Sequence, residues 1–297
     1  MNKALVFSID DSYVTPLKVL LYSLVETESI PSECEIFVLC SKDLSGSSRN
    51  DLLAYVFLLQ LEVRFIDVRL SNPSEMPISS SDHVSISTFY RLFVADILPD
   101  HIDIAVYLDS DMLAVRSIKS LFSLQLTSLV AAADHCEPSE AIRLWGPSSG
   151  TYFQAGVLVI PLRKWRELSL AREFRDTIKH SASLIRWWDQ DVLNLVIADR
   201  WQRIPLWFNV CHNLANLIPL SQLLDNAALI HFSGSKKPWN SVCTSPFSEQ
   251  WYKTYADVFE QPFDRSPFSS QKQFKMPRLR STLSLAVRPV KWMLRHF

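Results

Sequence analysis

Short apolar segments alternate with helical stretches along this chain, and this pattern constrains its fold more than any other feature. Residues 4–9 are almost all apolar, as in a buried strand, and Thr15 and Pro16 then supply an N-cap and a first-turn proline for a helix. Leucines at positions 17, 20, 21 and 24 form one apolar stripe on that helix. Repeated strand and helix signals of this kind predict an α/β domain with a mixed, largely parallel central sheet.

The same signals recur through the first 231 residues. Strands are predicted at residues 4–9, 35–39, 63–68, 104–108, 129–133, 156–160 and 227–231, and further helices at 48–59, 88–96, 162–180 and 189–198. Residues 134–151 contain two prolines, two glycines and several serines and are predicted to be a loop that covers a site. We expect one catalytic domain over residues 1–262, followed by a separate tail over residues 263–297.

The formal charge of −1 hides an uneven distribution. Of 30 Lys and Arg residues, seven lie in residues 272–297, which contain no Asp or Glu, so the rest of the chain has 23 basic against 31 acidic residues, a net charge of −8. An acidic body argues against nucleic acid as a partner. The tail combines an apolar helical face with a basic one, formed by Val290, Met293, Leu294 and Phe297 and by Arg288, Lys291 and Arg295 respectively.

This tail predicts a short amphipathic helix that binds an anionic membrane surface, with packing of the helix on the catalytic domain as the alternative. The N-terminus shows no signal-peptide core, and no segment reaches about 18 apolar residues. We therefore expect a cytoplasmic protein that associates peripherally with the inner face of the cell membrane. The five cysteines form no CxxC pair, which favours reduced thiols over a disulfide or zinc framework.

Two aspartates follow the strand predicted at residues 104–108. Asp109 and Asp111 stand at the carboxyl end of that strand, where ligands collect in open α/β sheets. Carboxylate oxygens suit Mg²⁺ or Mn²⁺, which often share their coordination with substrate phosphates. A solvated Asp-Ser-Asp turn is the structural alternative. The metal interpretation has both carboxylates facing an ion, so that neutralising either leaves the fold intact.

A second group of polar residues follows the strand predicted at residues 227–231. His231 can complete a site for a divalent metal, Gly234 allows close approach of the backbone to a phosphate, and Lys237 can neutralise a departing diphosphate. Asp10 follows the first strand and suits either a nucleoside or a helix cap. Asp189 and Asp191 suit the start of a helix, which leaves Gln190 between them without a structural explanation.

In order along the chain, these motifs resemble family eight of the retaining glycosyltransferases, above all the bacterial lipopolysaccharide galactosyl- and glucosyltransferases. The resemblance runs from Val6 to Trp239 and rests on the segments FSIDDSY (7–13), STFYRL (87–92), YLDSD (107–111), YFQAGVL (152–158), WDQDVLN (188–194) and HFSGSKKPW (231–239). It implies the GT-A fold, which is Rossmann-like and binds nucleotide-diphospho-sugars. Ser12 and Gln154 depart from it, because the family often has asparagine at both positions.

The resemblance also implies a function and its residues: transfer of a hexose, galactose or glucose, from a UDP-sugar to a saccharide or lipid-linked saccharide acceptor in surface glycan synthesis, with retention. It implies Mn²⁺ or Mg²⁺ at Asp109, Asp111 and His231, catalysis by Gln190 and Asp189, and donor binding by Ser8, Ile9, Asp10, Tyr13, Arg91, Ser110, Gln154, Gly234 and Lys237. A non-catalytic nucleotide-sugar-binding scaffold is the main alternative. A phosphotransferase with Asp109 as nucleophile is less consistent, because the threonine expected after the second aspartate is missing.

Overall fold

The computed structural model describes residues 1–41, 44–70, 76–78, 84–135, 138–146, 151–240 and 243–268. Its centre is a seven-stranded sheet in the order β3-β2-β1-β4-β7-β6-β8. The strands are β1 (Asn2–Ile9), β2 (Cys34–Cys40), β3 (Val63–Asp67), β4 (Ile102–Leu108), β6 (Val130–Asp134), β7 (Phe153–Pro161) and β8 (Trp201–Arg203). Strand β7 runs antiparallel to both β4 and β6, whereas the other neighbouring pairs are parallel. The sheet is therefore mixed, as expected.

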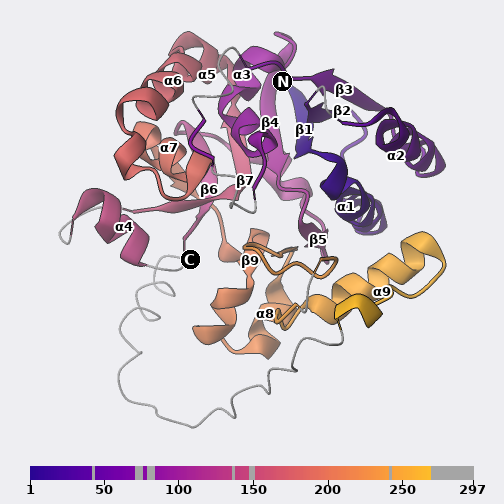
Figure 1. The fold of residues 1–297 in the computed structure, drawn as a ribbon. Coiled ribbons are helices and arrows are strands. Elements are labelled where there is room, and N and C mark those ends of the chain that lie inside the picture. The colour runs from indigo at the N-terminus through magenta and orange to yellow at the C-terminus, as the bar shows by residue number, and fades with distance from the viewer. Residues whose placement is uncertain are drawn as a thin grey trace, which may run out of the picture.

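Helices cover both faces of this sheet (Figure 1). Residues of β1 alternate between two cores: Leu5, Phe7 and Ile9 pack with α1 (Val14–Glu26), and Ala4 and Val6 pack with the segment that follows β3. A strand that is buried on both faces has an almost continuous apolar sequence, which explains why residues 4–9 were recognisable. On the α1 side lie α2 (Gly46–Leu58) and α9 (Ser248–Phe259), and the second core includes α3 (Val94–Ile97), α5 (Leu162–Glu167), α6 (Leu170–His180) and α7 (Trp188–Ile197).

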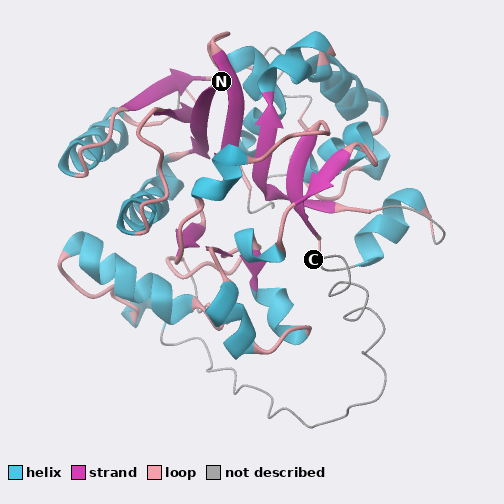
Figure 2. Cartoon of the chain, turned by 180° about the vertical axis from the view of Figure 1, so that it is seen from behind, coloured by secondary structure: helices cyan, strands magenta, loops and turns pink. Residues whose placement is uncertain are grey.

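A smaller sheet lies below the large one in both views (Figure 1; Figure 2). It consists of β5 (Met112–Ala114), β10 (Leu229–His231) and β9 (Val210–Cys211), in that order. Strand β10 runs antiparallel to β5 and parallel to β9. Because β5 follows directly on the Asp-Ser-Asp segment, this sheet joins the end of β4 to residues more than 100 positions later.

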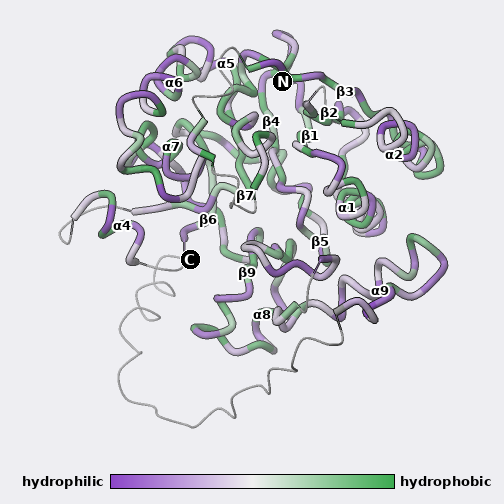
Figure 3. Tube along the Cα trace, in the orientation of Figure 1, coloured by the Kyte–Doolittle hydropathy of each residue, from purple (hydrophilic) through white to green (hydrophobic). Residues whose placement is uncertain are grey.

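Three predicted elements differ in the structure. The helix expected at 88–96 is mostly a 3-10 segment, Ile86–Phe93, followed by α3. The helix expected at 162–180 is two helices, because Ser169 adopts a φ of +52° between α5 and α6. The segment 134–151, expected to be a loop, contains α4 (Pro138–Trp145). Much of α6 is hydrophilic, as its colours show (Figure 3), and many of its residues are exposed.

The part of the chain with described coordinates contains no helix that is both long and apolar enough to cross a lipid bilayer. The described cysteines, Cys34, Cys40, Cys211 and Cys243, are all free thiols. The amphipathic helix expected after Pro289 lies outside the described residues. Helices α8 (Leu220–Asn226) and α9 and the short strands β5, β8 and β9 were not predicted from the sequence.

Candidate active site

A cavity of about 310 Å³ opens at the carboxyl ends of β1 and β4. Its lining includes Asp109, Asp111 and His231, which were predicted to bind metal, the predicted catalytic residues Asp189 and Gln190, and the predicted donor-binding residues Ser8, Tyr13, Arg91, Ser110, Gln154, Gly234 and Lys237. Ile9 and Asp10 are not among the lining residues. Ile9 is fully buried, and the Asp10 carboxylate accepts a hydrogen bond from Ser12 N (2.9 Å), which is the capping role left open by the sequence. Donor binding by these two residues remains a prediction.

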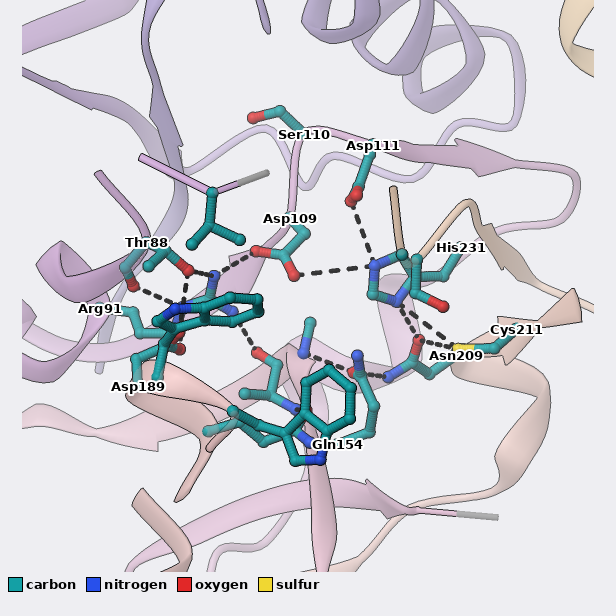
Figure 4. A pocket seen from close by; sticks show the side chains of 18 of the residues that line it. Thr88, Arg91, Asp109, Ser110, Asp111, Gln154, Asp189, Asn209, Cys211 and His231 are labelled. Atoms are coloured by element: carbon teal, nitrogen blue, oxygen red, sulfur yellow. Dashed lines mark hydrogen bonds and ion pairs between the residues drawn. The ribbon is translucent and has the colours of Figure 1, made fainter. Parts of the chain in front are cut away.

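The pairing of β5 with β10 brings His231 to the two aspartates. His231 is paired in register with Met112, the residue after Asp111, and Phe232 N donates a hydrogen bond to Asp111 O (2.9 Å). His231 Nε2 lies 3.1 Å from Asp111 Oδ1 and 3.7 Å from Asp109 Oδ2. Figure 4 marks both contacts by dashed lines. One ligand atom from each of the three residues can be chosen so that all lie within 4.8 Å of one another.

These separations fit neighbouring ligands of one divalent cation, whose bonds to oxygen or nitrogen are about 2.1 Å long. Asp111 Oδ1 is buried, and its contact with His231 Nε2 is an ion pair that lacks hydrogen-bond geometry. A buried carboxylate oxygen that accepts no hydrogen bond is suited to bind an ion or a water molecule. The Nδ1 atom of His231 lies 2.8 Å from Asn209 Oδ1, an outer contact typical of metal-ligating histidines. The three side chains therefore fit a metal site.

Charge in this site is closely balanced. Burial alone lowers the pKa of His231, but the Asp111 carboxylate raises it to about 10 overall. Burial alone raises the pKa of Asp111, and the charges of Lys237 and His231 bring it below its ordinary value. Lys237 Nζ is ion-paired with Asp111 Oδ2 and donates a hydrogen bond to Phe232 O (2.7 Å). The expectation that Asp111 has no partner within the protein is thus wrong.

Arg91 contacts two of the predicted site carboxylates, those of Asp109 and Asp189. The guanidinium is nearly fully buried and lies 2.7 Å from Asp109 Oδ1 and 2.9 Å from Asp189 Oδ2. It also donates a hydrogen bond to Ala155 O (2.7 Å) and lies over the Tyr107 ring at 4.6 Å. Burial raises the pKa of Asp189 to about 6 although Arg91 opposes this.

Residues at the start of α7 place Gln190 at the cavity. Trp188 has a φ of +42°, a strained conformation for a bulky residue that costs on the order of 1–3 kcal/mol and is common at functional sites. Gln190 Oε1 accepts a hydrogen bond from Ala155 N (3.0 Å), and its Nε2 donates to Tyr152 Oη (3.1 Å). Trp187 and Trp188 also line the cavity and bring aromatic rings to its wall.

Both carboxylates that flank Gln190 contact donors of the protein. Asp189 accepts a hydrogen bond from Thr88 Oγ1 (2.9 Å) in addition to its contact with Arg91. Asp191 is buried and accepts four hydrogen bonds, each 2.6 or 2.7 Å long, from the Tyr152 hydroxyl, the Arg143 guanidinium and the backbone N–H groups of residues 186 and 187. Arg143 comes from α4, so the unpredicted helix is tied to the residue next to Gln190.

Asn209 is a site residue that the sequence did not reveal. It is buried, lines the cavity and precedes β9, whose two residues are too few to show any periodicity. Cys211 and Asn213 reach the cavity from the same segment. The structure thus brings together, in one cavity at the carboxyl ends of β1 and β4, three side chains that fit a metal site and a glutamine.

Comparison with known proteins identifies the class of protein. The profile of glycosyl transferase family 8 matches residues 4–243, so the chain belongs to this family of glycosyltransferases. It is 25% identical to general stress protein A of Bacillus subtilis, over 82% of this chain and 89% of that protein. It is 27% identical to a lipopolysaccharide 1,2-glucosyltransferase of Escherichia coli, over 62% of this chain and 56% of that protein.

The fold agrees with this assignment. A galactosyltransferase, LgtC, solved in complex with donor and acceptor sugar analogues, superposes with a TM-score of 0.75 and 26% identity, over 87% of this chain and 97% of that one. The glycosyltransferase GlyE of Streptococcus pneumoniae shares the fold with a TM-score of 0.64 over 86% of this chain and 63% of that one. The predicted GT-A architecture is therefore confirmed.

Proposed function

We propose that this glycosyltransferase moves a hexose, galactose or glucose, from a UDP-sugar to a saccharide acceptor in lipopolysaccharide or other surface glycan synthesis, with retention and with Mn²⁺ or Mg²⁺. The observation that carries the proposal is the convergence of Asp109, Asp111 and His231 within 4.8 Å at the edge of a cavity that also contains Gln190. A non-catalytic scaffold needs only a nucleotide site, and it leaves the placement of Gln190 unexplained.

Different residues of the protein contact the diphosphate and the sugar of the donor in this proposal. Asp109, Asp111 and His231 would hold a divalent cation, which would supply positive charge to stabilise the departing diphosphate. Lys237 adds a further positive charge beside Asp111. On the sugar side, Gln154 and Asp189 present polar groups at the cavity wall, and Trp187 presents an apolar surface.

The contacts of the carboxylates favour attack from the face that the leaving group vacates. A double displacement needs a free carboxylate beneath the sugar, and both Asp189 and Asp191 are held by several donors of the protein. Gln190 is an amide and a poor nucleophile. We infer that the bond to the leaving group breaks first, the acceptor oxygen bonds to the same face, and a phosphate oxygen of the leaving group takes its proton.

The experiment that tests the function is a donor screen. Purified protein is incubated with individual UDP-sugars, with and without Mn²⁺, and released UDP is detected by mass spectrometry. We expect release from one hexose donor, stimulated by Mn²⁺ and accelerated by an acceptor saccharide. Tight donor binding without any release, at every metal and acceptor tested, would instead establish the scaffold.

Changing Gln190 to alanine is expected to slow turnover by about ten- to a thousandfold while donor binding changes little, because the residue acts mainly on the transition state. The measurements are kcat for transfer and the dissociation constant of UDP by calorimetry. Gln202→Ala is the matched control, since Gln202 lies on β8 and bonds to Thr127 outside the cavity. A glycosyl adduct trapped on Asp189 or Asp191 with a fluorinated donor would exclude front-face attack.

We also propose that residues 263–297 bind the cytoplasmic face of an anionic membrane, where a lipid-linked acceptor would be found. The support is the basic and apolar helical pattern of this segment and the net charge of −8 elsewhere. Such helices gain about 1 kcal/mol from each basic residue near the surface. The triple change of Arg288, Lys291 and Arg295 to Gln is therefore expected to weaken binding to phosphatidylserine-containing vesicles by about a hundredfold.

Vesicle sedimentation measures this binding, and activity on a soluble acceptor is expected to stay unchanged. A matched control neutralises three exposed basic residues of the body, Arg69, Lys164 and Arg172, and is expected to bind vesicles normally. Deleting residues 272–297 is expected to abolish sedimentation. If the deleted protein melts much earlier and the full chain ignores vesicles at low salt, the tail packs on the catalytic domain instead.

A further inference from the structure

The side chain of Asn209 joins the predicted metal site to the predicted sugar site. Asn209 is 3% exposed and lies between His231 and Gln154 (Figure 4). Its Oδ1 lies 2.8 Å from His231 Nδ1, and its Nδ2 donates a hydrogen bond to Gln154 Oε1. Strand β9 begins at the next residue and pairs with β10, so the backbone fixes Asn209 beside His231.

The orientation of each of the three side chains follows from one backbone group. Gly156 N donates a hydrogen bond of 2.6 Å to the Gln154 side chain, and only the amide oxygen of Gln154 can accept it. The end of Asn209 that faces this oxygen must therefore be its NH₂ group. Consequently Asn209 presents its oxygen to His231 Nδ1, which must carry a proton, and the other ring nitrogen faces Asp109 and Asp111.

The same bonds determine what Gln154 offers to a ligand. Its oxygen is occupied by Gly156 N and Asn209 Nδ2, whereas its Nε2 has no partner among the described residues. Gln154 lines the cavity, so it presents N–H groups and not a carbonyl to the donor. A donor atom at this position must be a hydrogen-bond acceptor, such as a hydroxyl or an N-acetyl oxygen.

We propose that Asn209 is a positioning residue that orients His231 toward the metal and, through the same amide group, orients Gln154 toward the donor sugar. The proposal rests on the metal-dependent transfer proposed above. Outer-shell partners of this kind change metal affinity by about 10- to 100-fold when they are removed. Cys211 Sγ lies 3.8 Å from both Asn209 Oδ1 and His231 Nδ1, and thiols are too weak as partners to replace the amide.

Three variants separate the two functions of Asn209. Asn209→Ala removes both contacts, Asn209→Asp keeps an acceptor for His231 but places an oxygen against Gln154, and Gln154→Glu changes only the group that faces the sugar. Asn226→Ala and Asn226→Asp are matched controls, because Asn226 is exposed and its side chain bonds to Gln222 O within its own helix.

The first measurement needs neither metal nor activity. In ¹⁵N-histidine-labelled protein, the Nδ1–H resonance of His231, assigned by its loss in His231→Gln, is expected to shift in Asn209→Ala and to persist in Asn209→Asp and Gln154→Glu. The second measurement is the dissociation constant of Mn²⁺ alone, followed by electron paramagnetic resonance. It is expected to rise about 10- to 100-fold in Asn209→Ala and to change less than about threefold in the other two variants.

The third measurement is kcat/KM for the donor, which is expected to fall at least about tenfold in all three variants. The proposal is wrong if Asn209→Ala leaves the resonance and the Mn²⁺ affinity unchanged, or if Asn209→Asp weakens Mn²⁺ binding as much as alanine does. If Asn209→Ala does not fold, the aspartate variant decides: loss of the His231 Nδ1–H resonance, or a Mn²⁺ affinity at least about tenfold weaker than that of wild type, in Asn209→Asp overturns the proposal. Failure of wild-type protein to bind Mn²⁺ contradicts the proposed metal dependence, whereas the resonance then still tests the contact of Asn209 with His231.

Discussion

Changing Asp111 to asparagine is expected to lower kcat for transfer by at least about a thousandfold, the upper range for removing one preorganised charge from an active site. The substitution keeps the shape of the side chain and removes the charge that faces His231 and Lys237. An amide is also a poor ligand for a hard divalent cation compared with a carboxylate. Initial rates over a range of Mn²⁺ concentrations measure the effect.

The same change is expected to destabilise the protein. Lys237 is 5% exposed and His231 is 2% exposed, so the substitution removes a carboxylate charge that faces two buried cationic groups. Breaking a buried ion pair from one side costs about 3–5 kcal/mol, which chemical denaturation at pH 7 can measure. A bound metal would partly mask this cost, so the measurement is made in a chelator.

The stability difference depends on pH in a defined direction. Because Lys237 and His231 hold the pKa of Asp111 below its ordinary value of 3.8, even though burial alone raises it, its charge stabilises the folded state above that value. This contribution is lost as the pH falls below 3.8 through the folded-state pKa. The free energies of unfolding of wild type and Asp111→Asn are therefore expected to converge at acid pH.

Two further substitutions, Asp109→Asn and Asp100→Asn, serve as comparisons for Asp111→Asn. Asp109→Asn is expected to lose activity to a similar extent with a smaller loss of stability, because Asp109 is more exposed and its partner Arg91 still contacts Asp189. Asp100→Asn, at a fully exposed position, is expected to change neither property. Full Mn²⁺-stimulated activity in both Asp109→Asn and Asp111→Asn would refute the metal site.

The sequence predicted those parts of the fold whose burial leaves an apolar pattern over many residues. Strand β1 is buried on both faces and gives an almost continuous apolar run, and the mostly buried α1 gives leucines at helical spacing. The smaller sheet was mostly invisible because β5 and β9 have three and two residues. The contact between Asn209 and His231 could not be predicted either, because the pairing of β9 with β10 brings these residues together.

In the candidate site, too, local sequence patterns were recognisable and long-range contacts were not. Asp109 and Asp111 were recognisable because a strongly apolar strand ends directly before them. Lys237 was recognised as a site residue, but its ion pair with Asp111 joins positions 126 residues apart, and no local pattern reports such a contact. The double role of Gln154, which bonds to Gly156 and Asn209 through its oxygen, likewise depends on tertiary structure.

Changing Gly156 to alanine is expected to disable the site by a steric clash with His231 and Gln154. A Cβ atom at this position would lie 2.5 Å from His231 Cε1, 2.8 Å from His231 Nδ1 and 2.9 Å from Gln154 Oε1. The backbone cannot easily yield, because Gly156 O accepts a hydrogen bond from Asp109 N (2.9 Å) and β7 lies between β4 and β6. The buried His231 ring must therefore move, at a cost of about 1–3 kcal/mol typical of an overpacked core.

Because the displaced ring is a proposed metal ligand, Gly156→Ala is expected to weaken Mn²⁺ binding and transfer by at least about a hundredfold. Gly46→Ala adds the same methyl group at the start of α2, where no atom lies within 4 Å of the new Cβ. That control is expected to keep full activity and to gain up to about 1 kcal/mol of stability from the better helix propensity of alanine. If Gly156→Ala binds Mn²⁺ and turns over like Gly46→Ala, then His231 tolerates displacement, and its contact with Asp109 and Asp111 does not determine metal binding.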